Sequence, residues 1–256
     1  VLVIPAYVYQ WKPIKEIVVF GELLAVSAVV MCLLFVMVDV GRPERAWHLL
    51  PFVGALNLPR SLLAWDVVVL NIYFVINLII VAYLLFCAYS NRPYNAKFVV
   101  PLILLSIPAA ISIHTVTAFL YNGLPGRPFW NASILAPRFI VSALCSGPAI
   151  LLILFQILRR WTRFDIKQEA IWKIAELMAY AMFLNLFLLG AETFRELYSG
   201  TEHMVHFVYL FRGVDGHDAL VPYAWASVIC SVVAFILFLV PATRRHPVTL
   251  NLGCLL

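Results

Sequence analysis

The stretch LLAWDVVVLNIYFVINLIIVAYLLFCAY, residues 62–89, decides the fold, because it holds a single charged side chain, Asp66, among mostly apolar residues. A helix that crosses the hydrocarbon core of a bilayer needs about 20 predominantly apolar residues. This stretch is long enough to cross once, and its charge falls in the first turns, near one membrane face. We therefore predict a transmembrane helix that carries a carboxyl group near one end.

The same apolar character recurs along the whole chain, at residues 17–38, 98–120, 134–158, 170–189 and 220–240. Short polar connections with turn residues separate these segments, such as NRP at 91–93 and NGLPG at 122–126. No ten-residue alternation of apolar and polar residues is present, which excludes a transmembrane β-barrel. The sequence predicts an all-α integral membrane protein, a polytopic helix bundle with at least six spans.

The composition excludes an ordinary water-soluble domain. The chain is 64% hydrophobic and 12% charged, whereas a soluble domain carries about 25% charged residues. A net charge of +5 is typical of basic cytoplasmic loops, so we expect a lipid membrane and no nucleic acid as partner. The five cysteines lie in apolar segments without CxxC pairing, and we expect neither disulfides nor a metal site.

Basic residues in the connections predict the orientation. We call the face that holds Lys12 and Lys15 side A, and the opposite face side B. Side A carries Lys12, Lys15, Arg92, Lys97, Arg159, Arg160, Arg163, Lys167, Arg244 and Arg245; side B carries Arg42, Arg45, Arg60, Arg127 and Arg212. Because cytoplasmic loops are enriched in Lys and Arg, we predict that side A is cytoplasmic.

A faint internal repeat suggests how the chain is organised. Glu22 precedes Asp39 by 17 residues, Glu176 precedes Glu192 by 16, and each second acid is followed three residues later by Arg. Such repeats are common in membrane folds, although two short matches also arise by chance. If the repeat is real, residues 1–168 form a first four-helix bundle and residues 169–256 the start of a second. We expect the natural polypeptide to continue beyond both ends.

Ionisable residues gather near side B. Asp39 ends one span, Asp66 begins the next, His114 lies late in the third, Arg138 early in the fourth, and Glu192 ends the fifth. Charges inside a bilayer cost about 2.5–3.5 kcal/mol each on insertion scales, so each needs a reason. This set suits a quinone headgroup, whose turnover moves two electrons and two protons. His114 is expected to hydrogen-bond the headgroup, while Asp66 or Asp39 accepts a proton.

Structural explanations stay open for several of these residues. Asp39 with Arg42, and Glu192 with Arg195, could be interfacial ion pairs that fix helix packing. Arg138 is expected to pair with an acid. A haem with two histidine ligands is not expected, because His114 is the single histidine inside a predicted span.

Two acids lie inside spans near side A. Glu22 and Glu176 occupy matched positions in the repeat and predict a proton path from the cytoplasm. Glu16 and Glu169 lie closer to the helix starts, where acids stabilise the positive end of the helix dipole.

Specific motifs resemble the polysulfide-reductase membrane-subunit family, also called NrfD-like. They are DVGRPERAW at 39–47, IHTVTAFLY at 113–121, GRPFWN at 126–131 and LAPRF at 135–139. Within that family, the sequence is most similar to the DsrP-type subunit of a sulfite-reduction-linked complex.

The resemblance implies a pair of four-helix bundles, with 8–10 spans in the full chain, in the cytoplasmic membrane of a prokaryote. It implies menaquinone or another quinone bound near the outer face, with His114 at the position of the family's quinone-site histidine and with Asp66 and Arg138 as further contacts. We add Tyr121 and Glu192 to the expected contacts because they lie near the same face. The resemblance also implies no haem and no iron–sulfur cluster in this chain. Electrons would pass to a ferredoxin-like iron–sulfur subunit beside other membrane and cytochrome subunits.

The expected docking surface consists of the side-B loops at 41–60, 121–133 and 199–218, which are rich in aromatic residues. The same aromatics could instead form the interfacial belt of a membrane protein. Two rival functions stay open, a proton-coupled solute transporter and a passive membrane anchor.

Overall fold

The structure is a computed structural model that describes residues 2, 4–15, 17–39, 41–50, 53–124, 126, 130–162, 164, 166–200 and 204–256, without the side chains of residues 8, 39 and 199. Its helices are η1 (Ile4–Val8), α1 (Lys12–Lys15), α2 (Val18–Asp39), η2 (Pro43–Leu49), α3 (Leu62–Tyr89), α4 (Ala96–Asn122), α5 (Leu135–Trp161), α6 (Gln168–Ser199), α7 (Met204–Phe211), α8 (Val221–Leu239), α9 (Pro241–Arg245) and α10 (Pro247–Leu255). Within these ranges the fold is all-α, as predicted.

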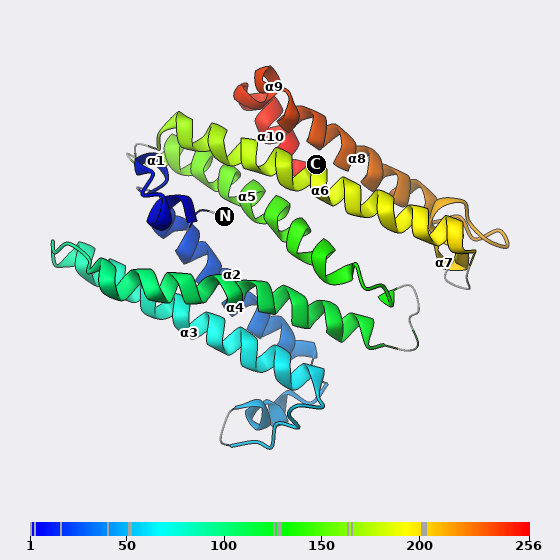
Figure 1. Cartoon of the computed structure of the whole chain (residues 1–256), viewed down its shortest axis with the longest axis horizontal. Helices are drawn as coiled ribbons and strands as arrows, with labels where there is room; N and C mark the ends of the chain where they lie inside the picture. Colours follow the sequence, from blue (N-terminus) through cyan, green and yellow to red (C-terminus); the bar gives the residue numbers. More distant parts are fainter. Residues whose placement is uncertain are drawn as a thin grey trace. The chain divides into compact units, whose positions relative to one another are not determined.

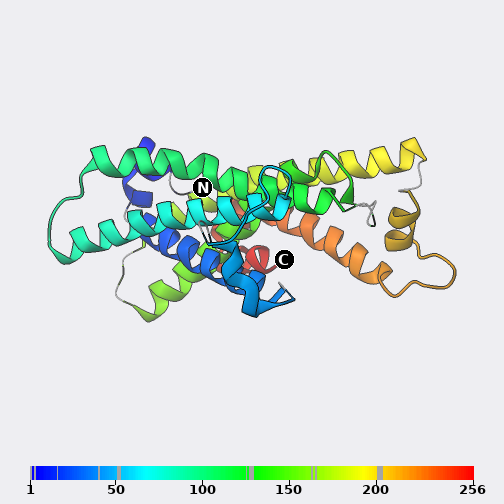
Figure 2. The same ribbon diagram turned by 90° about the horizontal axis from the view of Figure 1, so that it is seen from below.

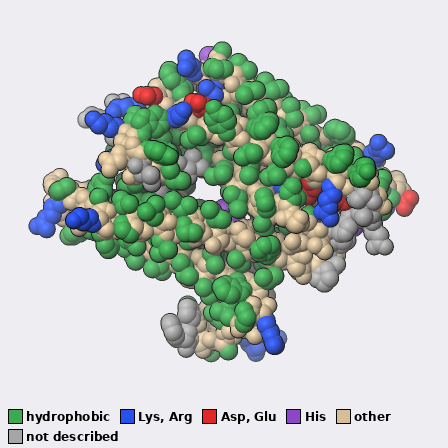
Figure 3. Space-filling view, viewed as in Figure 1, with side chains coloured by type: hydrophobic (Ala, Val, Ile, Leu, Met, Phe, Trp, Pro, Cys, Tyr) green, Lys and Arg blue, Asp and Glu red, His purple; other side chains and the backbone are tan. Residues whose placement is uncertain are grey.

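Six of these helices, α2, α3, α4, α5, α6 and α8, are long and apolar enough to cross a membrane. Each of them contains or overlaps one of the six predicted segments, so the prediction of at least six spans is confirmed. Figure 3 shows hydrophobic side chains covering most of the visible helix surface, with most Lys and Arg near helix ends. Apolar side chains that face outwards along helices of this length are suited to lipid rather than to water.

Residues Val1–Leu120 form one compact unit, which we call unit 1. In it, α2 packs along α3, and α3 runs beside α4 (Figures 1 and 2). The Tyr83 and Phe98 rings meet at 5.0 Å where α3 ends and α4 begins. Thr117 and Asp66 meet at the opposite ends of these helices, so the two helices are antiparallel. Ser61 caps the start of α3 by accepting from the Ala64 N–H at 3.2 Å.

Residues Tyr121–Leu256 form the second compact unit, unit 2. Here α6 packs along α5 and α8, and α10 turns back against both α5 and α8. Its core contains Phe155 of α5 and Phe238 of α8, both almost fully buried. A Cβ added at Gly253 would lie 3.0 Å from the Phe238 ring, so the glycine permits the close approach of α10 to α8.

The boundary between Leu120 and Tyr121 separates two groups of residues that each pack compactly. The predicted boundary at 168/169 concerned an internal repeat and stays a prediction.

Candidate functional site

The first candidate group lies in unit 1, where α3 begins and α4 ends. Asp66 is in the second turn of α3 and only 7% exposed. The Thr117 hydroxyl of α4 donates a hydrogen bond to its Oδ1 at 2.9 Å. Helices α3 and α4 thus share one buried carboxyl group near the end of an apolar bundle.

His114 precedes Thr117 by three residues on α4, so the two side chains lie on adjacent positions of the same helix face. Its imidazole is partly buried and has no hydrogen-bond partner among the residues that the structure describes. An imidazole one helical turn from a buried Asp–Thr pair can donate to or accept from a bound molecule through its ring nitrogen atoms. Thr117 thus places Asp66 near the helix face that carries His114, and the predicted roles of His114 and Asp66 stay predictions.

Asp39, the other predicted proton acceptor, is the last residue of α2. Its side chain lies outside the described residues, so its ion pair with Arg42 stays a prediction. The helix η2 follows, and in it the rings of Trp47 and His48 lie 3.8 Å apart.

The second candidate group lies in unit 2, where α5 begins. Arg138 Nη1 donates to Glu192 Oε2 of α6 in a charged hydrogen bond. The Glu192 side chain is 10% exposed and that of Arg138 is 29% exposed. The expectation that Arg138 pairs with an acid is met. A charge pair so deeply placed holds α5 and α6 in register, because either charge alone would be left poorly solvated.

The structure shows an ion-pair partner for Glu192 other than the Arg195 that the spacing suggested. Glu192 pairs with Arg138 instead, and Arg195 lies 3.7 Å from Glu196. The carboxylate of Glu192 points to the neighbouring helix α5. The i,i+3 spacing can suggest only a partner on the same helix, α6. Glu196 is itself buried, with Oε2 lacking a hydrogen-bond partner among the described residues.

Tyr121, predicted to contact the quinone, closes an aromatic cluster in unit 2. Its ring meets Trp130 edge-on at 5.0 Å and Phe139 at 5.8 Å. The residue is 38% exposed, so the cluster does not fully enclose its side chain. Phe129, counted among the docking aromatics, lies outside the described residues.

The two acids of the predicted proton path have different environments. Glu22 of α2 is 4% exposed, and neither carboxyl oxygen has a hydrogen-bond partner among the described residues. Glu176 of α6 is less buried than expected and forms an ion pair with Lys173 at 3.1 Å. The difference has a local cause, because Lys173 lies one turn earlier on the same helix and draws the carboxylate to the surface.

Tyr7 of η1 is a neighbour of Glu22. Burial, and next to it the Glu22 carboxylate, raise the pKa of the Tyr7 hydroxyl above its ordinary range. The phenol therefore keeps its proton at neutral pH. A protonated hydroxyl beside a buried carboxyl group is a group that can pass a proton.

Three residues of these groups were not predicted from the sequence as site residues: Thr117, Tyr7 and Glu196. Thr117 had a usable signal, its i+3 spacing from His114, and Glu196 follows Glu192 at i+4. Tyr7 had none, because its contact with Glu22 depends on how η1 folds against α2.

Within the described ranges, no three His, Cys, Asp or Glu side chains are close enough to hold a metal ion. The carboxyl group of Asp66 and the imidazole of His114 can bind an organic molecule through hydrogen bonds and exchange protons with it.

Comparison with known proteins identifies the family. Residues 2–255 match the family described as "Polysulphide reductase, NrfD", and the chain belongs to this family. The chain is 25% identical over 232 residues to a subunit of the selenate reductase of Mesobacillus selenatarsenatis, covering 77% of this chain and 52% of that protein. It is 26% identical over 201 residues to the Hdr-like menaquinol oxidoreductase integral membrane subunit of Archaeoglobus fulgidus, covering 77% and 48%.

The chain thus spans about half the length of the curated relatives it matches. The six apolar helices together with the family identify a multi-pass membrane protein.

Proposed function

We propose that this NrfD-family chain is the quinone-interacting membrane subunit of a multi-subunit respiratory oxidoreductase. It exchanges electrons between menaquinol, or another quinol, and an iron–sulfur partner subunit on the extracytoplasmic side. The observation that carries the proposal is the buried Asp66–Thr117 pair, one helical turn from the imidazole of His114. Relatives that are subunits of a selenate reductase and of a menaquinol oxidoreductase support it.

The residues of unit 1 fit a quinone headgroup. A bound quinol supplies two electrons and two protons when it is oxidised. The ring nitrogen atoms of His114 can hydrogen-bond one headgroup oxygen, and Asp66 is a buried carboxyl group that can receive a proton. Thr117 holds the carboxylate in place through its donated hydrogen bond. Asp39 is proposed as a second acceptor at the end of α2.

The residues of unit 2 have a supporting part in this proposal. Arg138 is occupied by Glu192, so we propose that the pair positions the α5–α6 framework of unit 2. The expectation that Arg138, Glu192 and Tyr121 contact the quinone stays a prediction from the sequence.

The partner is proposed to dock on the side-B loops. Electrons leaving the quinol need an acceptor on another protein, and a ferredoxin-like iron–sulfur subunit fits that role, beside other membrane and cytochrome subunits. Closeness to the DsrP-type subunit, a link to sulfur respiration and the cytoplasmic membrane of a prokaryote stay predictions that belong to this proposal.

Proton translocation is a separate part of the proposal. Glu22, buried without a hydrogen-bond partner among the described residues, and Tyr7 beside it would receive protons entering from side A. The partly exposed Glu176 would act at an entrance.

The test begins with the complex purified from its native membrane without stripping partners. Bound quinone is extracted and identified while the optical spectrum is recorded. We expect stoichiometric quinone, iron–sulfur absorbance from a partner, and loss of the quinone in His114→Ala. His246→Ala is the matched control, since His246 is exposed at the N-terminus of α10. A colourless protein without quinone would reject the proposal and favour the solute transporter or the passive anchor.

A further inference from the structure

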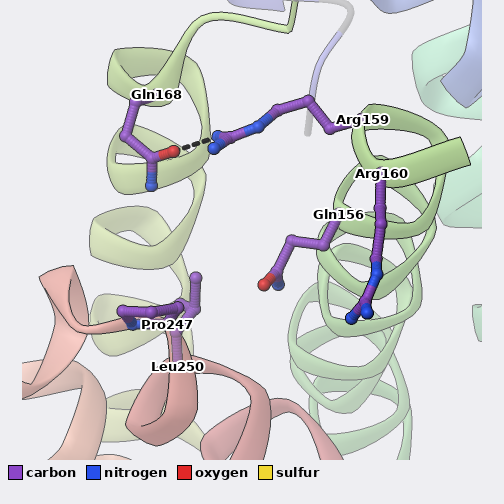
Figure 4. Close-up of a pocket in the computed structure, with 6 residues that line it drawn as sticks. All are labelled: Gln156, Arg159, Arg160, Gln168, Pro247 and Leu250. Atoms are coloured by element: carbon purple, nitrogen blue, oxygen red, sulfur yellow. Dashed lines mark hydrogen bonds between the residues drawn. The ribbon is translucent and has the colours of Figure 1, made fainter. Parts of the chain in front are cut away.

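A cavity of about 240 Å³ lies in unit 2, at the other end of α5 from Arg138. It is situated where α5 ends and α6 and α10 begin, which is side A in the predicted topology. Figure 4 shows side chains of these three helices around it. The lining residues are Gln156, Arg159, Arg160, Gln168, Pro247 and Leu250.

The polar part of this lining is cationic. Arg159 Nη1 donates to Gln168 Oε1, which holds one guanidinium across the gap between α5 and α6 (Figure 4). Arg160 has no ion-pair or hydrogen-bond partner among the described residues, and the described residues that line the cavity include no Asp or Glu. Two guanidinium groups without a carboxylate are suited to a phosphate group, which accepts several N–H donors at once.

The other part of the lining is apolar. Leu250 is almost fully buried, and Pro247 lies beside it at the start of α10. A water molecule occupies about 30 Å³ of liquid, so the cavity has room for a phosphate and the carbon atoms attached to it. A free inorganic anion has no carbon atoms to contact the apolar part of the lining, whereas a phosphate ester has them.

Lipid headgroups are expected at the ends of membrane-spanning helices, which is where this cavity lies. It is at the ends of the spans α5 and α6, and Trp161, the last residue of α5, is 81% exposed there. Tryptophan side chains are enriched at this membrane–water boundary. Basic pockets between transmembrane helices on the cytoplasmic side bind the headgroups of anionic lipids.

We propose that this cavity between α5, α6 and α10 binds the phosphodiester headgroup of an anionic phospholipid. Arg159 and Arg160 contact the phosphate, and Leu250 and Pro247 contact the glycerol and the first carbons of the acyl chains. The site is independent of the quinone proposal, because none of its residues belongs to the groups described above.

The test uses the whole complex, delipidated in detergent and transferred into nanodiscs of phosphatidylcholine that contain phosphatidylglycerol. Native mass spectrometry counts the phosphatidylglycerol retained. Arg160→Gln is expected to lower its affinity about fivefold, and Arg159→Gln combined with Arg160→Gln about twentyfold or more. Arg160→Lys keeps the charge and should retain most of the lipid. Arg92→Gln, at an exposed basic position after α3, is the matched control and should change nothing.

Equal retention in Arg160→Gln, with an unchanged melting temperature, would overturn the site. Displacement of the lipid by millimolar inorganic phosphate would mean that the cavity binds free phosphate, and equal retention of phosphatidylcholine would show that no anionic headgroup is selected.

Discussion

At the scale of single residues, Asp66 is the group on which the proposed chemistry depends. A charged side chain within a span costs about 2.5–3.5 kcal/mol on insertion scales. The hydrogen bond from Thr117 at 2.9 Å offsets part of that cost, and a bond to a charged group contributes about 1.5–3 kcal/mol. Thr117 therefore fixes where the carboxylate lies, and Asp66 is free to take up a proton without moving.

Replacing Asp66 with Asn tests this role. The amide still accepts a hydrogen bond from Thr117 but cannot take a proton, so quinol oxidation should fall by about 10²-fold, the usual contribution of a positioned acid or base. Bound quinone should be retained, because His114 is unchanged. Turnover with a soluble quinol analogue and quinone extraction measure the two effects. A variant with full turnover would remove Asp66 from the mechanism.

Thr117 provides the companion experiment. Thr117→Val removes the donor at nearly constant volume and should lower turnover about tenfold, the loss of roughly one such hydrogen bond. Thr117→Ser keeps the hydroxyl and should retain most of the activity. Equal losses in both variants would mean that packing, and not the hydrogen bond, is the important property.

At the scale of helices, the apolar runs predict the spans well because lipid selects long uninterrupted apolar segments. The C-terminal end of α6 lies beyond the end of the predicted apolar segment. The apolar segment stops at residue 189, whereas α6 continues to Ser199 and ends at Gly200 in the left-handed conformation. Backbone hydrogen bonds continue past the last apolar residue, and Glu192 is accommodated there because Arg138 of α5 neutralises it.

Partner choice between helices could not be predicted in the same way. Spacing along one chain suggests Arg195 for Glu192, since they are three residues apart. The actual partner is 54 residues away. Likewise, Thr117 and Asp66 are 51 residues apart. Such contacts follow from how α3 packs with α4 in unit 1 and α5 with α6 in unit 2, and the periodicity of a single sequence carries no information about that packing.

The Arg138–Glu192 pair makes a prediction about the stability of this helix pair. Arg138→Leu alone strands the Glu192 carboxylate and should destabilise the protein by about 3 kcal/mol, the low end for a buried pair because Arg138 is partly exposed. Combining Arg138→Leu with Glu192→Leu removes both charges and should restore most of the melting temperature. Thermal unfolding in detergent measures both variants. A double variant less stable than the single one would contradict a mainly structural role for the pair.

At the scale of the whole molecule, the chain matches about half the length of its relatives, and its two compact units carry different groups. Unit 1 holds the Asp66–Thr117 pair and Glu22, and unit 2 holds the Arg138–Glu192 pair and the cationic cavity. Glu22 and Asp66 both belong to the α2–α3 part of unit 1, near opposite ends of these helices. A proton path from Glu22 to Asp66 would therefore run within unit 1 alone.

Glu22→Gln tests whether protons cross along this path. Both Glu22 oxygens are buried and lack a hydrogen-bond partner among the described residues, so an amide of equal size should fit and leave the fold intact. In proteoliposomes, quinol oxidation should continue while the protons moved per quinol, followed with a pH-sensitive dye, fall. Glu169→Gln, an exposed acid in the first turn of α6, is the matched control and should leave the ratio unchanged. An unchanged ratio in Glu22→Gln would mean that oxidation near side B simply releases its protons there, and that Glu22 is buried for packing alone.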